Sequence, residues 1–440
     1  MTLLNGMLLK NILVIDPARH LEYQCDLRLK GDEIIEEGQG LTPQTGEELI
    51  EAGGLWAVPG MIDMHAHMRD LAQSDKEDLH TGSKAAAAGG FTTVVAMANT
   101  DPPLDSGAVF SLYLQRIAQR AVIEVLPVAC VTKGMRGEEL TNMVELADAG
   151  AVAFSDDGVT IQNMAVLRRA LEYVQLTGRT IISHAEDRDL VEGGVIDEGI
   201  VSTRMGLCGR PSAAESIAVA REIELIRTTM VPYHFTHLTT ARAVQLIRQA
   251  KAEGLPLTAD ATPHHISLAS SDIVSFDTNL KMNPPLRCDT DKQAIIAGVI
   301  DGTIDAIATD HAPHTRLEKS GMFAECPVGI IGLETAFAIS SRVLLSQINR
   351  LKFFGLFTCN PARILDLPQP SIRKGAPATM AIIDPELIWT YNPAEGMSRS
   401  RNTPYAQEEF KGKVVLTLYK GNRVFEDSSF KERRRQPAHR

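Results

Sequence analysis

PGMIDMHAHMRD, at residues 59–70, is an apolar run that ends in two histidines spaced two residues apart. The apolar part predicts a buried strand over residues 58–67. Side chains at positions i and i+2 of a strand point to the same side, so His65 and His67 can reach one metal ion together. Functional side chains at the carboxyl end of a buried strand are typical of the catalytic face of a parallel barrel.

From this strand to about residue 311, the sequence pattern predicts buried strands that alternate with helices. Seven further strands are expected at 91–99, 123–132, 151–157, 180–186, 233–240, 257–265 and 306–311. Apolar residues three or four apart predict helices at 76–90, 163–178, 211–229 and 241–254. Eight such units predict a (β/α)8 TIM barrel. A doubly wound sheet is the alternative, and the lack of a GxGxxG turn after the first strand disfavours it.

Both ends of the chain have a different pattern, in which apolar and polar residues alternate. This period of two indicates half-buried antiparallel strands. We expect residues 1–57 and 366–440 to pair into one small β-sandwich domain, because unpaired sheet edges promote aggregation. The catalytic barrel then spans residues 58–365, and a charged tail at 430–440 ends the second part of the sandwich.

The composition excludes several classes of partner. The 440 residues are 44% hydrophobic and 22% charged, which is typical of a globular protein. A net charge of −11 disfavours binding to nucleic acid or anionic lipid. The six cysteines lie far apart, and no apolar run reaches the roughly 18 residues that span a bilayer. We therefore expect a cytoplasmic protein.

Metal-ligand side chains recur at the ends of the predicted strands, namely His65, His67, Asp157, His184, His237 and Asp310. Four imidazoles and two carboxylates suit zinc. The absence of ligating cysteines argues against a closed structural site. Six ligands are too many for one tetrahedral ion. The set therefore predicts two Zn2+ ions that share a bridging carboxylate and a bridging hydroxide.

Several segments together resemble the amidohydrolase superfamily and, within it, the dihydroorotase family of the long bacterial type. They are PGMIDMHAHMRD, KEDLHTGSKAAAAGGFTTVVAMANTDPPLD, AFSDDG, SHAED, HLTT, TPHH, KMNPPLR, ATDHAPH and GIIGLET, with SRSRNTP and KGNRVFED near the C-terminus. The resemblance covers nearly the whole chain.

The resemblance implies a role for each candidate ligand. His65, His67 and Asp310 would bind the first zinc ion, His184 and His237 the second, and Asp157 would bridge the two. Many relatives use a carboxylated lysine as the bridge, but the segment FSDDG contains no lysine. Asp157 is preferred to its neighbour Asp156 because the 27-residue interval to His184 fits this subgroup. Lys133 is the nearest alternative, although a loop lysine is usually solvated.

Substrate recognition requires local cations, because dihydroorotate carries a carboxylate and the protein is negative overall. Arg69 offers a planar fork for bidentate binding of a carboxylate. The resemblance implies that Asn99 and His314 complete this clamp and that Asn283 lines the pocket for the ring. The other histidines of these motifs, His264, His265 and His311, are expected to support or pack against the site. Neighbouring strand residues face opposite ways, so at most one of His264 and His265 should point inward.

The resemblance also implies a reaction, the reversible hydrolysis of dihydroorotate to N-carbamoyl-L-aspartate in pyrimidine biosynthesis. Asp310 would be the catalytic residue that moves a proton between the attacking hydroxide and the ring nitrogen. Ring closure converts two carboxylates into one and consumes a proton, so acid favours closure.

Two rival functions remain at this stage. A hydantoinase or allantoinase typically carries the modified lysine and lacks the clamp of Arg69, Asn99 and His314. A catalytically silent subunit of an aspartate carbamoyltransferase complex would have lost ligands that this chain retains. The segments RDLAQSDKED and MANT depart from the family's common forms, which leaves the loop shape near the pocket open. A homodimer, with or without aspartate carbamoyltransferase, is the expected assembly.

Overall fold

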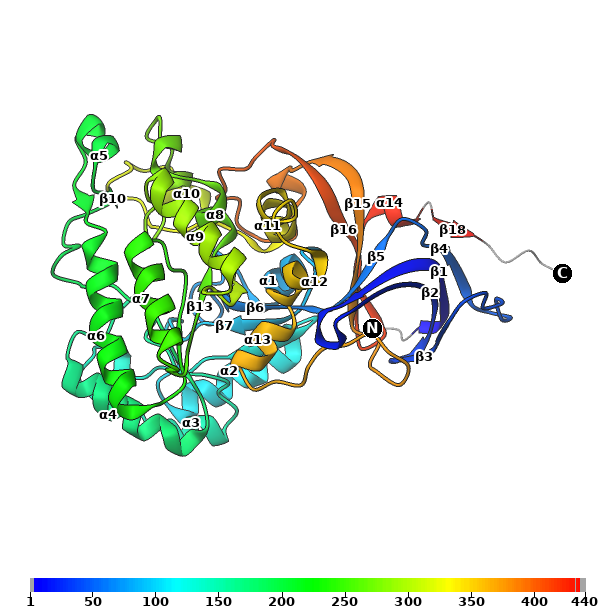
Figure 1. Ribbon diagram of the computed structural model, residues 1–440, viewed down its shortest axis with the longest axis horizontal. Helices are drawn as coiled ribbons and strands as arrows, with labels where there is room; N and C mark the ends of the chain where they lie inside the picture. Colours follow the sequence, from blue (N-terminus) through cyan, green and yellow to red (C-terminus); the bar gives the residue numbers. More distant parts are fainter. Residues whose placement is uncertain (1–3, 432, 436–440) are drawn as a thin grey trace.

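The computed structural model describes residues 4–431 and 433–435 of the chain. It consists of a barrel of strands and helices beside a large β-sheet (Figure 1). Glu432 and residues 436–440 of the predicted charged tail lie outside the described residues.

The barrel strands follow one another in sequence order and run parallel. They are β6 (Met61–Ala66), β7 (Phe91–Ala96), β8 (Glu124–Pro127), β9 (Ile181–Ser183), β12 (Tyr233–Phe235), β13 (Leu257–Ala261) and β14 (Ala306–Ile307). Phe154 fills the remaining position through single parallel bridges to Ala129 and Ile181. A bridge between Ala66 and His311 then joins the last strand to the first. The ring is closed, which confirms the predicted barrel.

Helices cover the outside of the ring. They are α1 (Leu79–Ala88), α2 (Gly107–Arg120), α3 (Met143–Asp148), α4 (Met164–Val174), α6 (Ala213–Thr229), α7 (Ala241–Ala252), α9 (Asp289–Asp301), α11 (Ala336–Leu344), α12 (Arg350–Gly355) and α13 (Cys359–Ile364). Helix α4 shows why they form, because its buried residues fall on one stripe: Val166, Leu167, Ala170, Leu171 and Val174. All four predicted helices are present, in α1, α4, α6 and α7.

Strands from both ends of the chain form one nine-stranded sheet. They are β1 (Leu4–Asp16), β2 (Leu21–Gly31), β3 (Glu33–Gly38), β4 (Glu48–Glu51), β5 (Trp56–Pro59), β15 (Met380–Thr390), β16 (Glu409–Tyr419), β17 (Asn422–Glu426) and β18 (Arg434–Arg435). Strand β5 joins the two ends, since it pairs with β1 on one side and β15 on the other. The β-sandwich built from both termini is thus confirmed, whereas the boundaries after residues 57 and 365 stay predictions.

Short elements stand over the mouth of the barrel. They are β10 (Ile196–Asp197), β11 (Gly209–Arg210), α5 (Ile200–Met205), α8 (Pro263–Ser267) and α10 (Arg316–Lys319), while α14 (Ser428–Lys431) lies on the sheet. No helix in the described part of the chain is long and apolar enough to span a bilayer.

The expected strand over 257–265 is wrong in its second half. Strand β13 stops at Ala261, and a helix begins at Pro263. The Thr262 side chain accepts a hydrogen bond from the His265 backbone N–H at 3.1 Å, and proline suits a first helical turn. His264 and His265 therefore lie in a helix, where neighbours need not face opposite ways, and both are buried.

Candidate active site

A cavity of about 310 Å³ opens at the carboxyl ends of the barrel strands. Its wall includes nine of the ten predicted site residues, the tenth being His65 just beneath: His67, Arg69, Asn99, Asp157, His184, His237, Asn283, Asp310 and His314. Residues 327–329 complete the wall from the loop after α10. Side chains spread over about 250 positions of the chain thus meet around one space.

His65, His67 and Asp310 form the first potential metal-binding group. Asp310 Oδ1 lies 3.1 Å from His67 Nε2 and 3.5 Å from His65 Nε2. All three side chains are buried. The two histidines come from β6 and the residue just beyond it, and the aspartate follows β14, so the neighbouring first and last strands of the barrel build this group.

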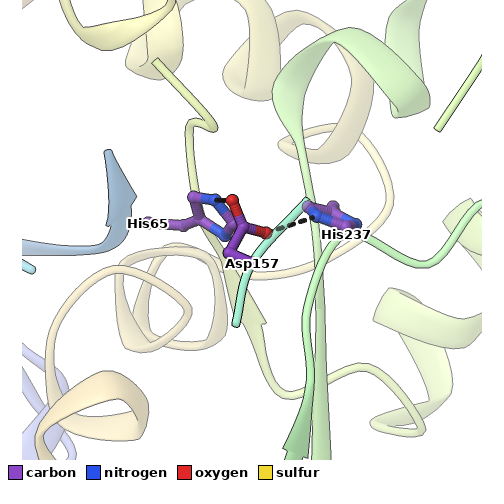
Figure 2. Close-up of side chains that lie close together, drawn as sticks. All are labelled: His65, Asp157 and His237. Atoms are coloured by element: carbon purple, nitrogen blue, oxygen red, sulfur yellow. Dashed lines mark ion pairs between the residues drawn. The ribbon is translucent and has the colours of Figure 1, made fainter. Parts of the chain in front are cut away.

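Asp157 lies between this group and a second pair of histidines. Its Oδ2 is 3.4 Å from His65 Nε2, and its Oδ1 is 3.6 Å from His237 Nε2 (Figure 2). His184 Nδ1 is 3.1 Å from His237 Nε2 and 3.9 Å from Asp157 Oδ1. The carboxylate therefore turns one oxygen toward each pair, as a bridging ligand would.

Asp156, the alternative bridge, points elsewhere. Its Oδ1 accepts hydrogen bonds from the backbone N–H groups of Val131 and Thr132 at 2.8 and 3.1 Å. It therefore ties two neighbouring loops together. Lys133, the other alternative, is about half exposed and pairs with Glu139 on the surface.

The charges and unpaired atoms of this cluster fit a metal cation. Burial raises the pKa of Asp157, but the neighbouring His65 and His237 hold that pKa well below its ordinary value. Burial alone would lower the pKa of His65, but the neighbouring Asp157 and Asp310 carboxylates outweigh this effect and raise that pKa to about 10. Two buried carboxylates thus attract positive charge to one point. His65 Nε2 and Asp157 Oδ1 are also buried without a hydrogen-bond partner, and a cation would satisfy both.

A hydrogen-bonded chain behind His65 fixes the orientation of its ring. Asp260 can only accept, so the Thr236 hydroxyl donates to it at 3.1 Å. The same hydroxyl then accepts from His65 Nδ1 at 2.8 Å, so in the neutral ring, the form that binds a metal, Nε2 is free of a proton and faces the two aspartates. His234 Nε2 lies 2.8 Å from the same Asp260 oxygen. Outer contacts of this type fix the tautomer of a metal-binding histidine.

Thr236→Val is expected to weaken metal binding by about 10- to 100-fold, because it removes the hydroxyl that fixes the His65 tautomer. Competition with a chelator of known affinity measures this change directly. Thr180→Val is the matched control, since Thr180 is a buried threonine whose hydroxyl donates to Pro232 O at the opposite end of the barrel. Equal metal affinity in both variants would contradict the role of Thr236.

Arg69 and His314 stand side by side at the cavity wall. Arg69 Nη2 donates to His314 Nε2 at 3.3 Å, and Arg69 Nε donates to Pro313 O at 3.3 Å. Among the described residues, Arg69 forms no ion pair with a carboxylate, although it is half-buried. Burial and the charge of Arg69 lower the pKa of His314 to about 3, so the ring is neutral at pH 7. The pair offers an uncompensated cation that suits an anionic ligand.

The two predicted asparagines also reach the cavity, each held in one orientation. Asn99 Oδ1 accepts from His67 Nδ1 at 2.9 Å, so Asn99 orients His67 as well as facing the cavity. Asn283 Oδ1 accepts from Arg210 Nη1, and its Nδ2 lies 3.4 Å from His184 Nε2. Sequence reasoning had no signal for Arg210, because it comes from β11 in a connection with no motif.

Three residues of the site adopt left-handed backbone conformations that non-glycine residues rarely take. The φ angles are 51° at Arg69, 41° at His237 and 47° at Asp310. Strain of this kind persists only where the surroundings enforce it, and it gathers at functional sites. The fold thus places these side chains at some cost in stability.

The chain is similar to proteins of known activity over almost its whole length. Residues 54–243 match the family described as Dihydro-orotase-like. A dihydroorotase of Geobacter sp. (strain M21) is 44% identical over 96% of this chain and 99% of its own. One from Citrifermentans bemidjiense is 43% identical over 96% of this chain and all of its own. The chain belongs to the dihydroorotase family.

Solved structures show that the dihydroorotase fold is shared more widely. An L-hydantoinase from Arthrobacter aurescens superposes with a TM-score of 0.85 over 97% of this chain and 96% of its own, at 21% identity. A dihydropyrimidinase from Brevibacillus agri gives 0.83 over 96% and 95%, also at 21%. At this identity the likeness shows the fold alone. Dihydroorotases are cyclic amide hydrolases of the amidohydrolase superfamily, so the predicted family, fold and enzyme class are confirmed.

Thr236 and Asp260 are residues of the dihydroorotase site that sequence reasoning missed. Both stand at or near the carboxyl ends of barrel strands, the criterion that found the histidines. Thr236 precedes His237 directly, so a search for any polar residue at a strand end would have found it. His234, on β12, also contacts Asp260 at 2.8 Å.

Proposed function

We propose that this chain catalyses the zinc-dependent, reversible cyclisation of N-carbamoyl-L-aspartate to L-dihydroorotate. The observation that supports the proposal most strongly is the shared cavity. One wall carries the unpaired cation Arg69 with His314, and the floor carries the His and Asp cluster. A substrate with a carboxylate beside a cyclic amide matches both.

Six side chains would hold two zinc ions. We assign His65, His67 and Asp310 to the first, His184 and His237 to the second, and Asp157 to both, because its two oxygens face the two groups. When bound, such ions polarise a carbonyl and lower the pKa of water from 15.7 to about 7.

The clamp orients the substrate. Arg69 supplies two N–H donors in a fixed fork, and the neutral His314 lies beside it at 3.3 Å, so a carboxylate is bound in one direction. Asn99 completes the clamp, and Asn283, which also lines the cavity, would contact the ring. The local positive charge of Arg69 offsets the net charge of −11, which would otherwise repel a dianionic substrate.

Asp310 transfers the proton. Burial raises its pKa, but the neighbouring His67 and the charge of His65 hold that pKa below its ordinary value, so the carboxylate is ionised. During ring opening, water adds to the ring carbonyl and the carbon–nitrogen bond breaks. Asp310 accepts the proton of the attacking water and delivers it to the departing ring nitrogen, which ends as part of the ureido group. Ring closure follows the same steps in reverse.

Charge balance sets the pH sense of the equilibrium. The open product has two carboxylates and the ring has one, so closure consumes one proton and acid favours it. We assign the closing direction to the physiological reaction, as pyrimidine biosynthesis requires.

Metal analysis and one substrate panel test the proposal. We expect about two zinc ions per chain and interconversion of dihydroorotate and N-carbamoyl-L-aspartate that a chelator abolishes and zinc restores. Activity only on hydantoins or allantoin would favour the first rival function. A chain that binds no metal and turns over none of these compounds would favour the silent subunit.

We also propose a cytoplasmic location, a homodimer and an association with aspartate carbamoyltransferase. Size-exclusion chromatography with and without that enzyme tests the assembly.

A further inference from the structure

Residues 397–402, here called the crossing segment, connect two strands of the terminal sheet but lie against the barrel. The segment runs between β15 and β16. Ser398 Oγ and the Arg399 backbone N–H donate to Glu77, which stands in the connection after β6. Ser400 Oγ donates to Lys76 O at 2.6 Å in the same connection. A part of the chain outside the barrel strands is thus bound to the barrel mouth.

Asn402 attaches the other end of the crossing segment to the loop after β14. Its Oδ1 accepts from the His314 backbone N–H at 3.1 Å. Its Nδ2 donates to Ala312 O at 3.0 Å and to Gly329 O at 3.1 Å. The side chain is 5% exposed, so water cannot replace these bonds. One buried amide therefore joins the loop at 312–314 to the loop at 329.

The backbone held by Asn402 is the backbone that supports the carboxylate clamp. Arg69 donates through Nε to Pro313 O and through Nη2 to the His314 ring, both at 3.3 Å. Two side chains thus hold residues 312–314. Asn402 binds Ala312 and His314, and Arg69 binds Pro313 and the His314 ring. A shift of this loop would move His314 and remove both acceptors of Arg69.

The crossing segment also fixes the start of the same loop. The Gly332 N–H donates to His311 Nδ1 at 3.1 Å, so the proton of His311 is on Nε2, which lies 3.4 Å from Glu77. Glu77 is fully buried and also binds Ser398 and Arg399. The loop from 311 to 314 is therefore bound to the crossing segment at both ends.

We propose that Asn402 is a positioning residue for substrate binding, which holds Arg69 and His314 in the geometry that a substrate carboxylate requires. The inference rests on the proposed function. Asparagine suits this place because the site needs one acceptor and two donors on a short side chain. Aspartate has no N–H to donate, and glutamine is one methylene longer.

Asn402→Asp is expected to raise KM for dihydroorotate by about 10-fold or more, with kcat within about threefold of the wild type and zinc content unchanged. The Kd for orotate, a planar carboxylate-bearing pyrimidine, should rise by a similar factor in titration calorimetry. Asn402→Ser, which retains one donor and one acceptor, should show a smaller change in the same direction. Thermal melting of each variant identifies the temperature range in which all are folded.

Asn392→Asp is the matched control. Asn392 lies in the same connection, but its side chain accepts from the Ala394 backbone N–H and donates to Glu395 rather than to the loop at 312–314. It should leave KM and the orotate Kd unchanged. An unchanged KM in the folded Asn402 variants would overturn the inference, as would a loss of zinc and kcat together with KM, since that indicates general loosening. If the wild type itself fails to turn over dihydroorotate, the proposed function has failed instead, and orotate binding by wild type and Asn402→Asp then shows whether the positioning role stands.

Discussion

Asp310→Asn should lower kcat for dihydroorotate hydrolysis, and for the reverse cyclisation, by about 10³-fold or more. Asparagine keeps an oxygen in the place of Oδ1, 3.1 Å from His67, but it cannot accept and return the proton of the reaction. Zinc retention by this variant, measured by elemental analysis, separates the loss of proton transfer from a loss of metal. Steady-state kinetics in both directions measure kcat.

The control flanks the same strand. Asp305 precedes β14 at the opposite end of the barrel, where it accepts from Lys251 and from the Ala259 backbone N–H. Asp305→Asn should retain kcat, although it weakens a partly buried ion pair. A kcat near the wild-type value in zinc-loaded Asp310→Asn would remove Asp310 from the chemistry and leave it only as a ligand.

The barrel and the gathering of the candidate ligand side chains at its mouth were predictable, because strand period and strand order follow from the local sequence. His65 and His67 stand two residues apart at the end of an apolar strand, and parallel strands bring their carboxyl ends to one face. Asp157, His184 and His237 follow from the same rule, although the strands that carry them are shorter than expected. Phe154 makes only single bridges, and Asp157 stands in the loop beyond it.

The supporting contacts were not predictable, because they join segments far apart in the chain. Asn402 contacts Ala312, which lies 90 residues away in the chain, and no local sequence pattern at either position predicts this contact. The same holds for Arg210, which orients Asn283 across 73 residues. The helix at His264 was missed for a local reason, since Pro263 after a threonine is a helix start that the apolar run obscured. The left-handed backbone at Arg69 has no sequence signal either, because it is imposed by the surrounding loops.

Arg69→Ala is expected to raise KM for dihydroorotate by about 100-fold or more while kcat falls much less. The loss of a buried charge-assisted contact typically costs about 2–5 kcal/mol, and both cyclic and open substrates carry the carboxylate that we propose Arg69 binds. Arg69→Lys should recover only part of the loss, because lysine retains the charge without the planar fork. Arg168→Ala is the charge-matched control, since Arg168 is exposed on α4 and pairs with Glu172. Kinetics at saturating and limiting substrate separate the two parameters.

A double variant connects this prediction to Asn402. If Asn402 acts only by holding the loop that supports Arg69 and His314, its removal should cost little once Arg69 is gone, apart from what His314 contributes alone. The effects of Arg69→Ala and Asn402→Asp on KM should then be less than additive, whereas residues without shared partners add to within about 0.5 kcal/mol. Dihydrouracil, which has the cyclic amide but no carboxylate, gives the complementary measurement. Both substitutions should leave any binding of dihydrouracil unchanged, because this compound has no carboxylate for Arg69 and His314 to bind. Strict additivity with dihydroorotate would mean that the crossing segment and the clamp act on the substrate independently.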